Sequence, residues 1–82
     1  MIYIKYFAKY RELMQMASEE LLSNCNTLAA LKLVLRETYP QAGTMLDDPR
    51  CITAINQQIV KSDSTPICPG DEVAFYPPVS GG

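Results

Sequence analysis

Hydrophobic and polar residues alternate near both ends of the chain with the two-residue period of a β-strand. Residues 1–8 place two isoleucines on one side and Lys5 on the other. Residues 71–76 place Phe75 on one side and Glu72 on the other. Because successive side chains of a strand point to opposite faces of a sheet, each segment predicts a strand with one apolar and one mixed face.

The middle of the chain predicts one clear helix. Thr27 can cap the free backbone amides at a helix start, and leucines follow it at helical spacing. The apolar stripe of this helix comprises Leu28, Leu31, Val34 and Leu35. Pro40 ends the helix, because proline disfavours helical backbone in the residue before it. Between residues 9 and 26 the periods are mixed, and we predict a turn followed by a short strand over 19–24.

A polar loop and three further strands complete the predicted fold. Residues 51–60 predict two short strands that reverse near Asn56 and Gln57, and a turn-rich connector leads to the last strand. The order strand, strand, helix, strand, strand, strand predicts an α+β fold, with a mixed sheet of about five strands and one main helix packed on one face. Residues 1–82 form a single domain, since 82 residues cannot divide their apolar side chains between two cores.

The outward faces of the first and last strands predict a docking surface. Lys5 and Glu72 mark these faces as solvent-exposed, and the two-residue period places Phe7 and Tyr76 on them as well. If the two strands are neighbours, one apolar patch forms, and it comprises Phe7, Ala74, Tyr76, Pro77 and Pro78. Aromatic residues are enriched at the centres of interfaces, so we expect this patch to bind another protein.

Composition and charge exclude several classes of function. The net charge is −2 and the seven basic residues are scattered, which argues against nucleic-acid binding. The chain has no histidine, and Cys25, Cys51 and Cys68 are widely spaced, so we predict small buried or half-buried thiols rather than disulfides or a zinc site. No apolar run approaches the ~20 residues that span a bilayer, and no secretory signal opens the chain. We therefore expect a cytoplasmic protein without a membrane partner.

The chain offers no catalytic machinery of its own. Without an imidazole base, the usual serine and cysteine nucleophiles lack their activating partner. The four glycines form neither a phosphate loop nor a dinucleotide fingerprint. Asp47 and Asp48 are adjacent carboxylates, but Pro49 follows them, and this pattern favours a solvated turn. We expect the chain to bind neither a metal nor a cofactor.

Three segments together resemble one family. The sequences FAKYREL over 7–13, AINQQIV over 54–60 and PGDEVAFYPPVSGG over 69–82 look like the small, sulfur-carrying subunits of molybdopterin synthases. The resemblance runs from end to end, and the block with Pro-Pro-Val before Ser-Gly-Gly is its most specific part. It implies a β-grasp, ubiquitin-like fold, which agrees with the predicted order of elements, and residues 77–82 would form an extended carboxyl-terminal tail.

The resemblance also implies where the chemistry takes place. An ionised carboxylate is a poor electrophile and needs activation. In this family, a ubiquitin-activating-type adenylyltransferase uses ATP and Mg²⁺ to adenylate the terminal glycine, here Gly82. A cysteine desulfurase and sulfurtransferase relay then supplies sulfur for a thiocarboxylate. The loaded tail inserts into the large synthase subunit and donates sulfur to cyclic pyranopterin monophosphate, within a heterotetramer that builds the dithiolene of the molybdenum cofactor.

Matching motifs assign roles to the remaining candidate residues. Phe7 and Tyr76 would contact the large subunit, although the family favours phenylalanine at the position of Tyr76. Arg11 would add an ion pair at the rim of this contact. The residues that would line the access channel of the large subunit are Pro77, Pro78, Val79, Ser80 and Gly81. Glycines without side chains fit a narrow channel, and the two prolines hold the root of the tail extended.

Two other functions share the same fold and tail. A sulfur carrier for thiamine synthesis or tRNA thiolation would also end in Gly-Gly, but should lack Pro-Pro-Val before it. A ubiquitin-like modifier would be joined to lysines through Gly82. The sequence separates this last function poorly from sulfur donation, because some carriers can do both.

Overall fold

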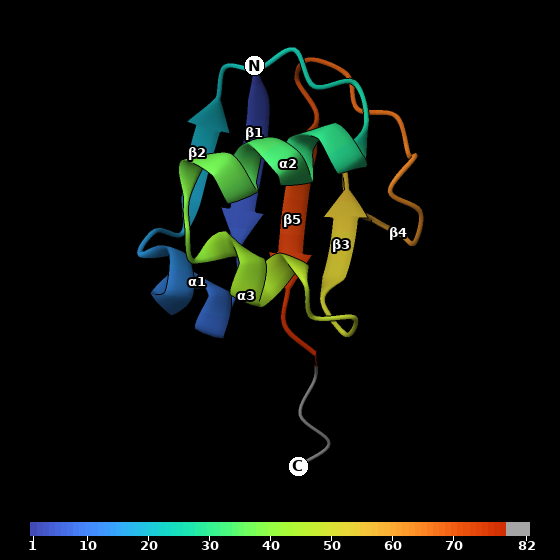
Figure 1. The fold of residues 1–82 in the computed structure, drawn as a ribbon. Helices are drawn as coiled ribbons and strands as arrows, with labels where there is room; N and C mark the ends of the chain where they lie inside the picture. Colours follow the sequence, from blue (N-terminus) through green and yellow to red (C-terminus); the bar gives the residue numbers. More distant parts are fainter. Residues whose placement is uncertain (79–82) are drawn as a thin grey trace.

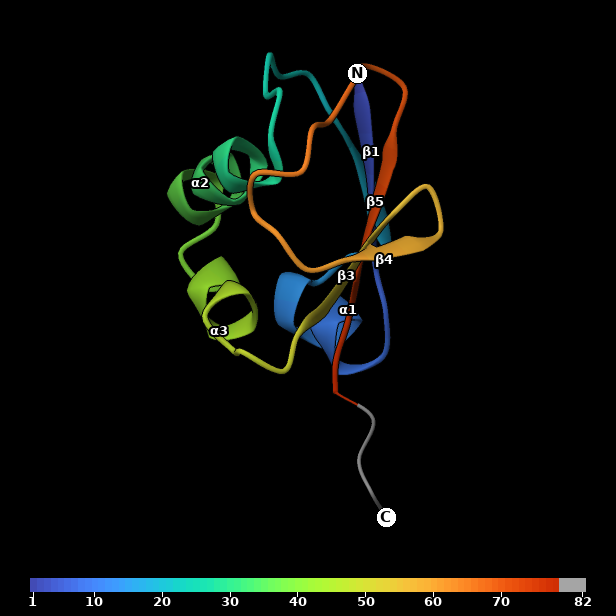
Figure 2. The same ribbon diagram turned by 90° about the vertical axis from the view of Figure 1, so that its right-hand side faces the viewer.

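A five-stranded sheet covered by helices on one face forms the body of the protein (Figures 1 and 2). The computed structural model describes residues 1–78. Along the chain the elements are β1 (Ile2–Tyr6), α1 (Lys9–Met14), β2 (Ser18–Leu21), α2 (Leu28–Thr38), α3 (Ala42–Leu46), β3 (Ile52–Ile55), β4 (Gln58–Val60) and β5 (Glu72–Tyr76). This arrangement confirms the predicted α+β class.

The first and last strands, β1 and β5, lie next to each other in the middle of the sheet. The strand order is β2-β1-β5-β3-β4, and β1 pairs with β5 in parallel, whereas the other pairs are antiparallel. The sheet is therefore mixed and mostly antiparallel, as predicted. The parallel register aligns Lys5 with Ala74 and Tyr6 with Phe75, so the carboxyl ends of β1 and β5 lie side by side.

The core fills the space between the sheet and the helices. Ile4, Phe75, Leu31 and Leu35 are fully buried there. The predicted cap of α2 is confirmed, because the Thr27 hydroxyl accepts a hydrogen bond of 3.2 Å from the backbone amide of Ala30. Three leucines of the predicted stripe are buried and Val34 is half-buried. The helix thus covers the sheet with the face that its sequence predicted.

Two short helices were not predicted. The segment expected as a turn contains α1, where Tyr10 and Met14 lie four residues apart and are buried together. The expected polar loop after Pro40 contains α3, which buries Ala42, Met45 and Leu46. Both helices are too short for a hydrophobic period to stand out, and packing against the core stabilises them. The strand expected over 19–24 is confirmed as β2, which begins and ends earlier.

Hydrogen bonds from two tyrosines connect the edge strand β2 to β1 and to the end of α2. Glu19 lies on the inner face of the sheet, and its carboxylate accepts hydrogen bonds of 2.8 Å from the hydroxyls of both Tyr6 and Tyr39. Burial and the Glu19 carboxylate raise the pKa of Tyr6, and the hydrogen bond to Glu19 raises the pKa of Tyr39. Both phenols therefore stay protonated as donors at neutral pH.

Within residues 1–78, no helix is long and apolar enough to cross a bilayer.

The β3–β4 hairpin turns where the sequence predicted, at two residues with positive φ. Asn56 has φ 51° and Gln57 has φ 70°. Hairpin turns of two residues favour this left-handed backbone, because its twist matches that of the strands. Asparagine tolerates the conformation well, whereas a longer side chain such as that of glutamine is strained by it.

Gln57→Gly is therefore expected to stabilise the fold. Relief of the strained backbone outweighs the greater freedom of glycine in the unfolded chain, and we expect a gain of about 0.5 kcal/mol in the free energy of unfolding. Urea denaturation would measure it. Gln58→Gly is the matched control, since Gln58 lies in β4, where glycine weakens a strand. Equal effects of the two substitutions would contradict the prediction.

Candidate functional site

The face of the sheet opposite the helices carries the candidate site. Lys5 and Glu72 lie on this face and form an ion pair of 3.3 Å, which confirms that they mark the outward side of β1 and β5. The register places Tyr3 next to Glu72 and Lys5 next to Ala74. The charged part of the face thus lies at the start of β5, and its apolar part lies toward the end of that strand.

Two aromatic rings stack where β1 and β5 end. Phe7 and Tyr76 have ring centroids 4.4 Å apart and an angle of 12° between the ring planes. The backbone amide of Phe7 donates to the carbonyl of Phe75 at 3.2 Å, which continues the pairing of the two strands. Both rings are half-buried. The structure therefore brings together the two aromatic residues that the sequence assigned to partner binding.

An apolar hollow of about 690 Å³ adjoins this aromatic pair. We call it the docking hollow, and it is lined by Phe7, Ala8, Ile52, Ala54, Gln57, Ile59, Tyr76, Pro77 and Pro78. Most of the predicted patch belongs to it. Ala74 is the exception: it lies on the same face, but only 3% of it is exposed, because its short side chain is covered between neighbouring strands.

The docking hollow also contains residues that sequence reasoning missed. Ile52 and Ala54 lie on the outer face of β3, beside Tyr76 and Ala74. Ile59 of β4 pairs with Ala54 and is 67% exposed, a high value for an isoleucine. The alternation of β3 and β4 could have revealed this face, had the pairing of these strands with β5 been known. An exposed isoleucine within an apolar surface indicates a binding region.

The remaining predicted site residues have different positions. Pro77 and Pro78 are half-buried on the wall of the docking hollow, where they directly follow β5. Arg11 is exposed on α1, and within residues 1–78 it forms no ion pair and does not line the hollow. The predictions for Val79, Ser80, Gly81 and Gly82 fall outside the described residues.

The cysteines and carboxylates do not form a metal site in the part of the chain that the structure describes. Cys25 and Cys51 are half-buried, as predicted, whereas Cys68 is exposed, since it lies in a turn at the surface. Burial raises the pKa of the Cys51 thiol. Asp48 lies in the predicted turn, and hydrogen bonds from Arg50 lower the pKa of its carboxyl group.

Comparison with known proteins places the chain in a family. Residues 4–82 match the ThiS family. The chain belongs to this family. The ThiS family member is 37% identical to the molybdopterin synthase sulfur carrier subunit of Escherichia coli (strain K12), over 100% of both chains. It is 32% identical to the subunit of the same name from Haemophilus influenzae, again over 100% of both chains.

Solved structures confirm the β-grasp fold predicted for this ThiS family member. SAMP1 from Haloferax volcanii superposes with a TM-score of 0.84 at 23% identity, over 99% of this chain and 98% of that one. A protein–protein complex of subunits 1 and 2 of molybdopterin-converting factor from Helicobacter pylori 26695 contains a chain with a TM-score of 0.74 at 23% identity. That match covers 99% of this chain and 97% of the other.

Proposed function

We propose that this chain is the sulfur carrier subunit of a molybdopterin synthase. The observation that carries the proposal is the end-to-end identity of 37% with a protein of that name. The docking hollow supports it, because a carrier must dock on other proteins and the hollow lies at the root of the segment that would react. The absence of histidine fits a subunit that donates a group rather than catalysing its transfer.

The large synthase subunit is the partner proposed for the docking hollow. A related fold occurs in a complex of two converting-factor subunits, which supports a partner of this kind. Burying the stacked pair of Phe7 and Tyr76, together with Ile59, would supply an apolar interface centre. Because Pro77 and Pro78 form the wall of the same hollow, docking would direct the following residues toward the active site of the partner.

The proposed chemistry takes place at the carboxylate of Gly82. An activating enzyme of the ubiquitin-activating type would join this carboxylate to AMP from ATP, with release of pyrophosphate. The terminal sulfur of a persulfide from a cysteine desulfurase relay would then displace AMP and form an acyl disulfide. A thiol would cleave the sulfur–sulfur bond of this intermediate, which releases the thiocarboxylate and forms a disulfide with the relay. In the large subunit, the thiocarboxylate would transfer its sulfur to cyclic pyranopterin monophosphate, and water would restore the carboxylate. Gly81 and Gly82 would leave the reacting carbonyl unhindered.

Mass spectrometry of the intact chain tests this proposal directly. Incubation with ATP, Mg²⁺, the activating enzyme and a sulfur source should increase the mass by the difference between one sulfur and one oxygen. Addition of the large subunit and cyclic pyranopterin monophosphate should reverse the increase and yield molybdopterin. A chain that gains this mass but yields no molybdopterin would contradict the proposed acceptor, and a chain that forms ladders of conjugates would instead be a protein modifier.

The three cysteines should not be needed for sulfur loading. Cys51 is a poor nucleophile, because burial raises the pKa of its thiol, and the proposed reaction requires only the backbone carboxylate. The triple variant Cys25→Ala, Cys51→Ala, Cys68→Ala is expected to gain the same mass as the unmodified sequence. Urea unfolding would show that the variant is folded. A folded triple variant that fails to load would indicate a persulfide on a cysteine.

A further inference from the structure

Ala8 has a backbone conformation that alanine rarely adopts. Its φ is 52° and its ψ is −128°. The backbone amide of Tyr10 donates a hydrogen bond of 3.1 Å to the carbonyl of Phe7, which closes a turn around Ala8. These features match the first central position of a type II′ turn, where glycine, asparagine and aspartate dominate. Alanine is therefore strained at this position, because its Cβ atom crowds the backbone at positive φ.

The fold by itself does not favour alanine at this position. Ala8 is exposed, so its methyl group fills no space in the core. The segments on both sides are held by other contacts: the amide of Phe7 donates to the carbonyl of Phe75 at 3.2 Å, and Tyr10 is only 3% exposed. A glycine would close the same turn between β1 and α1 without strain. The alanine therefore needs an explanation outside the core.

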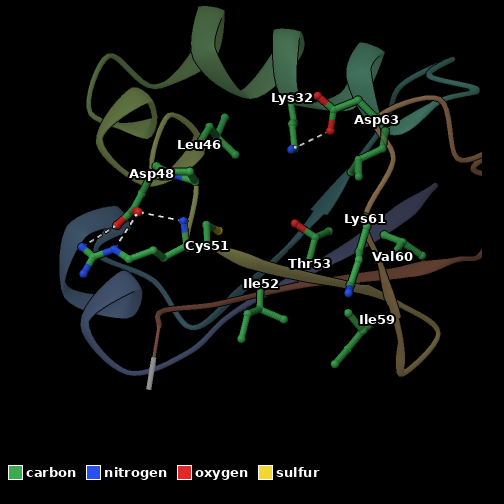
Figure 3. A pocket seen from close by; sticks show the side chains of 13 residues that line it. Lys32, Leu46, Asp48, Cys51, Ile52, Thr53, Ile59, Val60, Lys61 and Asp63 are labelled. Carbon is green, nitrogen blue, oxygen red and sulfur yellow. Dashed lines mark hydrogen bonds and ion pairs between the residues drawn. The ribbon is translucent and has the colours of Figure 1, made fainter. Parts of the chain in front are cut away.

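Ala8 lies in the wall of the docking hollow, next to Phe7. On another wall, Ile52 and Ile59 belong to strands whose pairing holds them in place. Figure 3 shows the side chains of both isoleucines on the face of the hairpin turned away from α2. Phe7, in contrast, follows the last residue of β1, so its position depends on the turn at Ala8.

We propose that Ala8 is a positioning residue, whose restricted turn holds Phe7 stacked on Tyr76 so that the docking hollow is formed before a partner binds. The inference rests on the proposed docking of the large synthase subunit. A glycine would populate more backbone conformations, and binding would then have to order the turn. Strained backbone of this kind occurs preferentially at functional sites, where it fixes one conformation. The chain thus gives up stability for a preorganised surface.

The variant Ala8→Gly separates stability from binding. Urea unfolding should give a higher midpoint than that of the unmodified chain, because glycine removes the strain. Calorimetric titration with the large synthase subunit should show binding about fivefold weaker, because the freed turn must be ordered on docking. In the free protein, nuclear spin relaxation should show greater motion of the Phe7 amide and ring. This last measurement requires no partner.

Gln15→Gly is the matched control. Gln15 has φ 59° at the other end of α1, is exposed, and lies outside the docking hollow. Its replacement by glycine should also raise the unfolding midpoint, because glycine is the preferred residue just after a helix. The affinity for the large subunit and the motion of Phe7 should stay unchanged. Equal losses of affinity in the two variants would overturn the proposal.

Three results for Ala8→Gly would also overturn it. An unchanged affinity would show that the restricted turn does not serve binding, and a lower unfolding midpoint would show that alanine serves the fold. Weaker binding with unchanged motion of Phe7 would mean that only the methyl contact was lost. If the unmodified chain does not bind the large subunit, the proposed function is wrong, and the relaxation of Phe7 then supports or overturns the positioning role of Ala8 by itself.

Discussion

Removal of Gly82 is expected to abolish sulfur donation while leaving the stability of the fold unchanged. The shortened chain still ends in a glycine carboxylate, so only the reach of the tail changes, by about 3.5 Å. Displacement of a reacting atom by even 1 Å can cost about 100-fold in rate, and this shift is larger. Molybdopterin formation by the purified synthase measures the loss, and urea unfolding measures stability.

Ser80→Ala is the control for this truncation, because it alters a neighbouring residue and keeps the length of the tail. We expect this variant to retain most of its activity. A truncated chain that forms molybdopterin at the rate of the full chain would show that the reacting group lies elsewhere. Loss of activity accompanied by lower stability would contradict the separation between the tail and the folded domain.

Phe7→Ala is expected to weaken binding of the large subunit by at least about 2 kcal/mol, or roughly 30-fold, as truncation of an aromatic side chain in an interface centre does. The fold should lose only about 1 kcal/mol, since Phe7 is half-buried and its main contact is the stacked ring of Tyr76. Calorimetric titration with the large subunit measures the first quantity, and urea unfolding measures the second.

Tyr3→Ala provides the matched control for this variant. Tyr3 lies on the same face of β1 and is 41% exposed, but it neighbours Glu72 and lies outside the docking hollow. Its removal should change binding by less than about 0.5 kcal/mol, as most residues outside the centre of an interface do. Equal losses of affinity in both variants would show that the partner covers the whole face rather than the hollow.

The sequence predicted the elements with strong periods and the side of the sheet that faces outward. The alternation of β1 and β5 placed Lys5 and Glu72 outward, and the structure pairs them. Thr27 and the leucines after it predicted α2, because capping and helical spacing act within the segment itself. The same alternation placed Phe7 and Tyr76 on the outward face. It predicted that they share one patch if β1 and β5 are neighbours, and the structure pairs these two strands.

What the sequence did not reveal depends on contacts between distant segments. No local pattern shows that β1 and β5 are parallel, or that β3 lies beside β5 and adds Ile52 to the docking hollow. The helix α3 forms because Met45 and Leu46 reach the core, although its five residues show no clear period. Ile59 is a surface residue whose role becomes visible only when the hairpin is folded over the same face.

The central position of β5 has a mechanical consequence. A partner that pulls on the carboxyl terminus would apply force along a strand bonded to β1 on one side and to β3 on the other. These bonds run across the direction of pull, so they would bear the load together in shear rather than opening one after another. A chain built in this way can be withdrawn from one complex and passed to the next without unravelling from its loaded end.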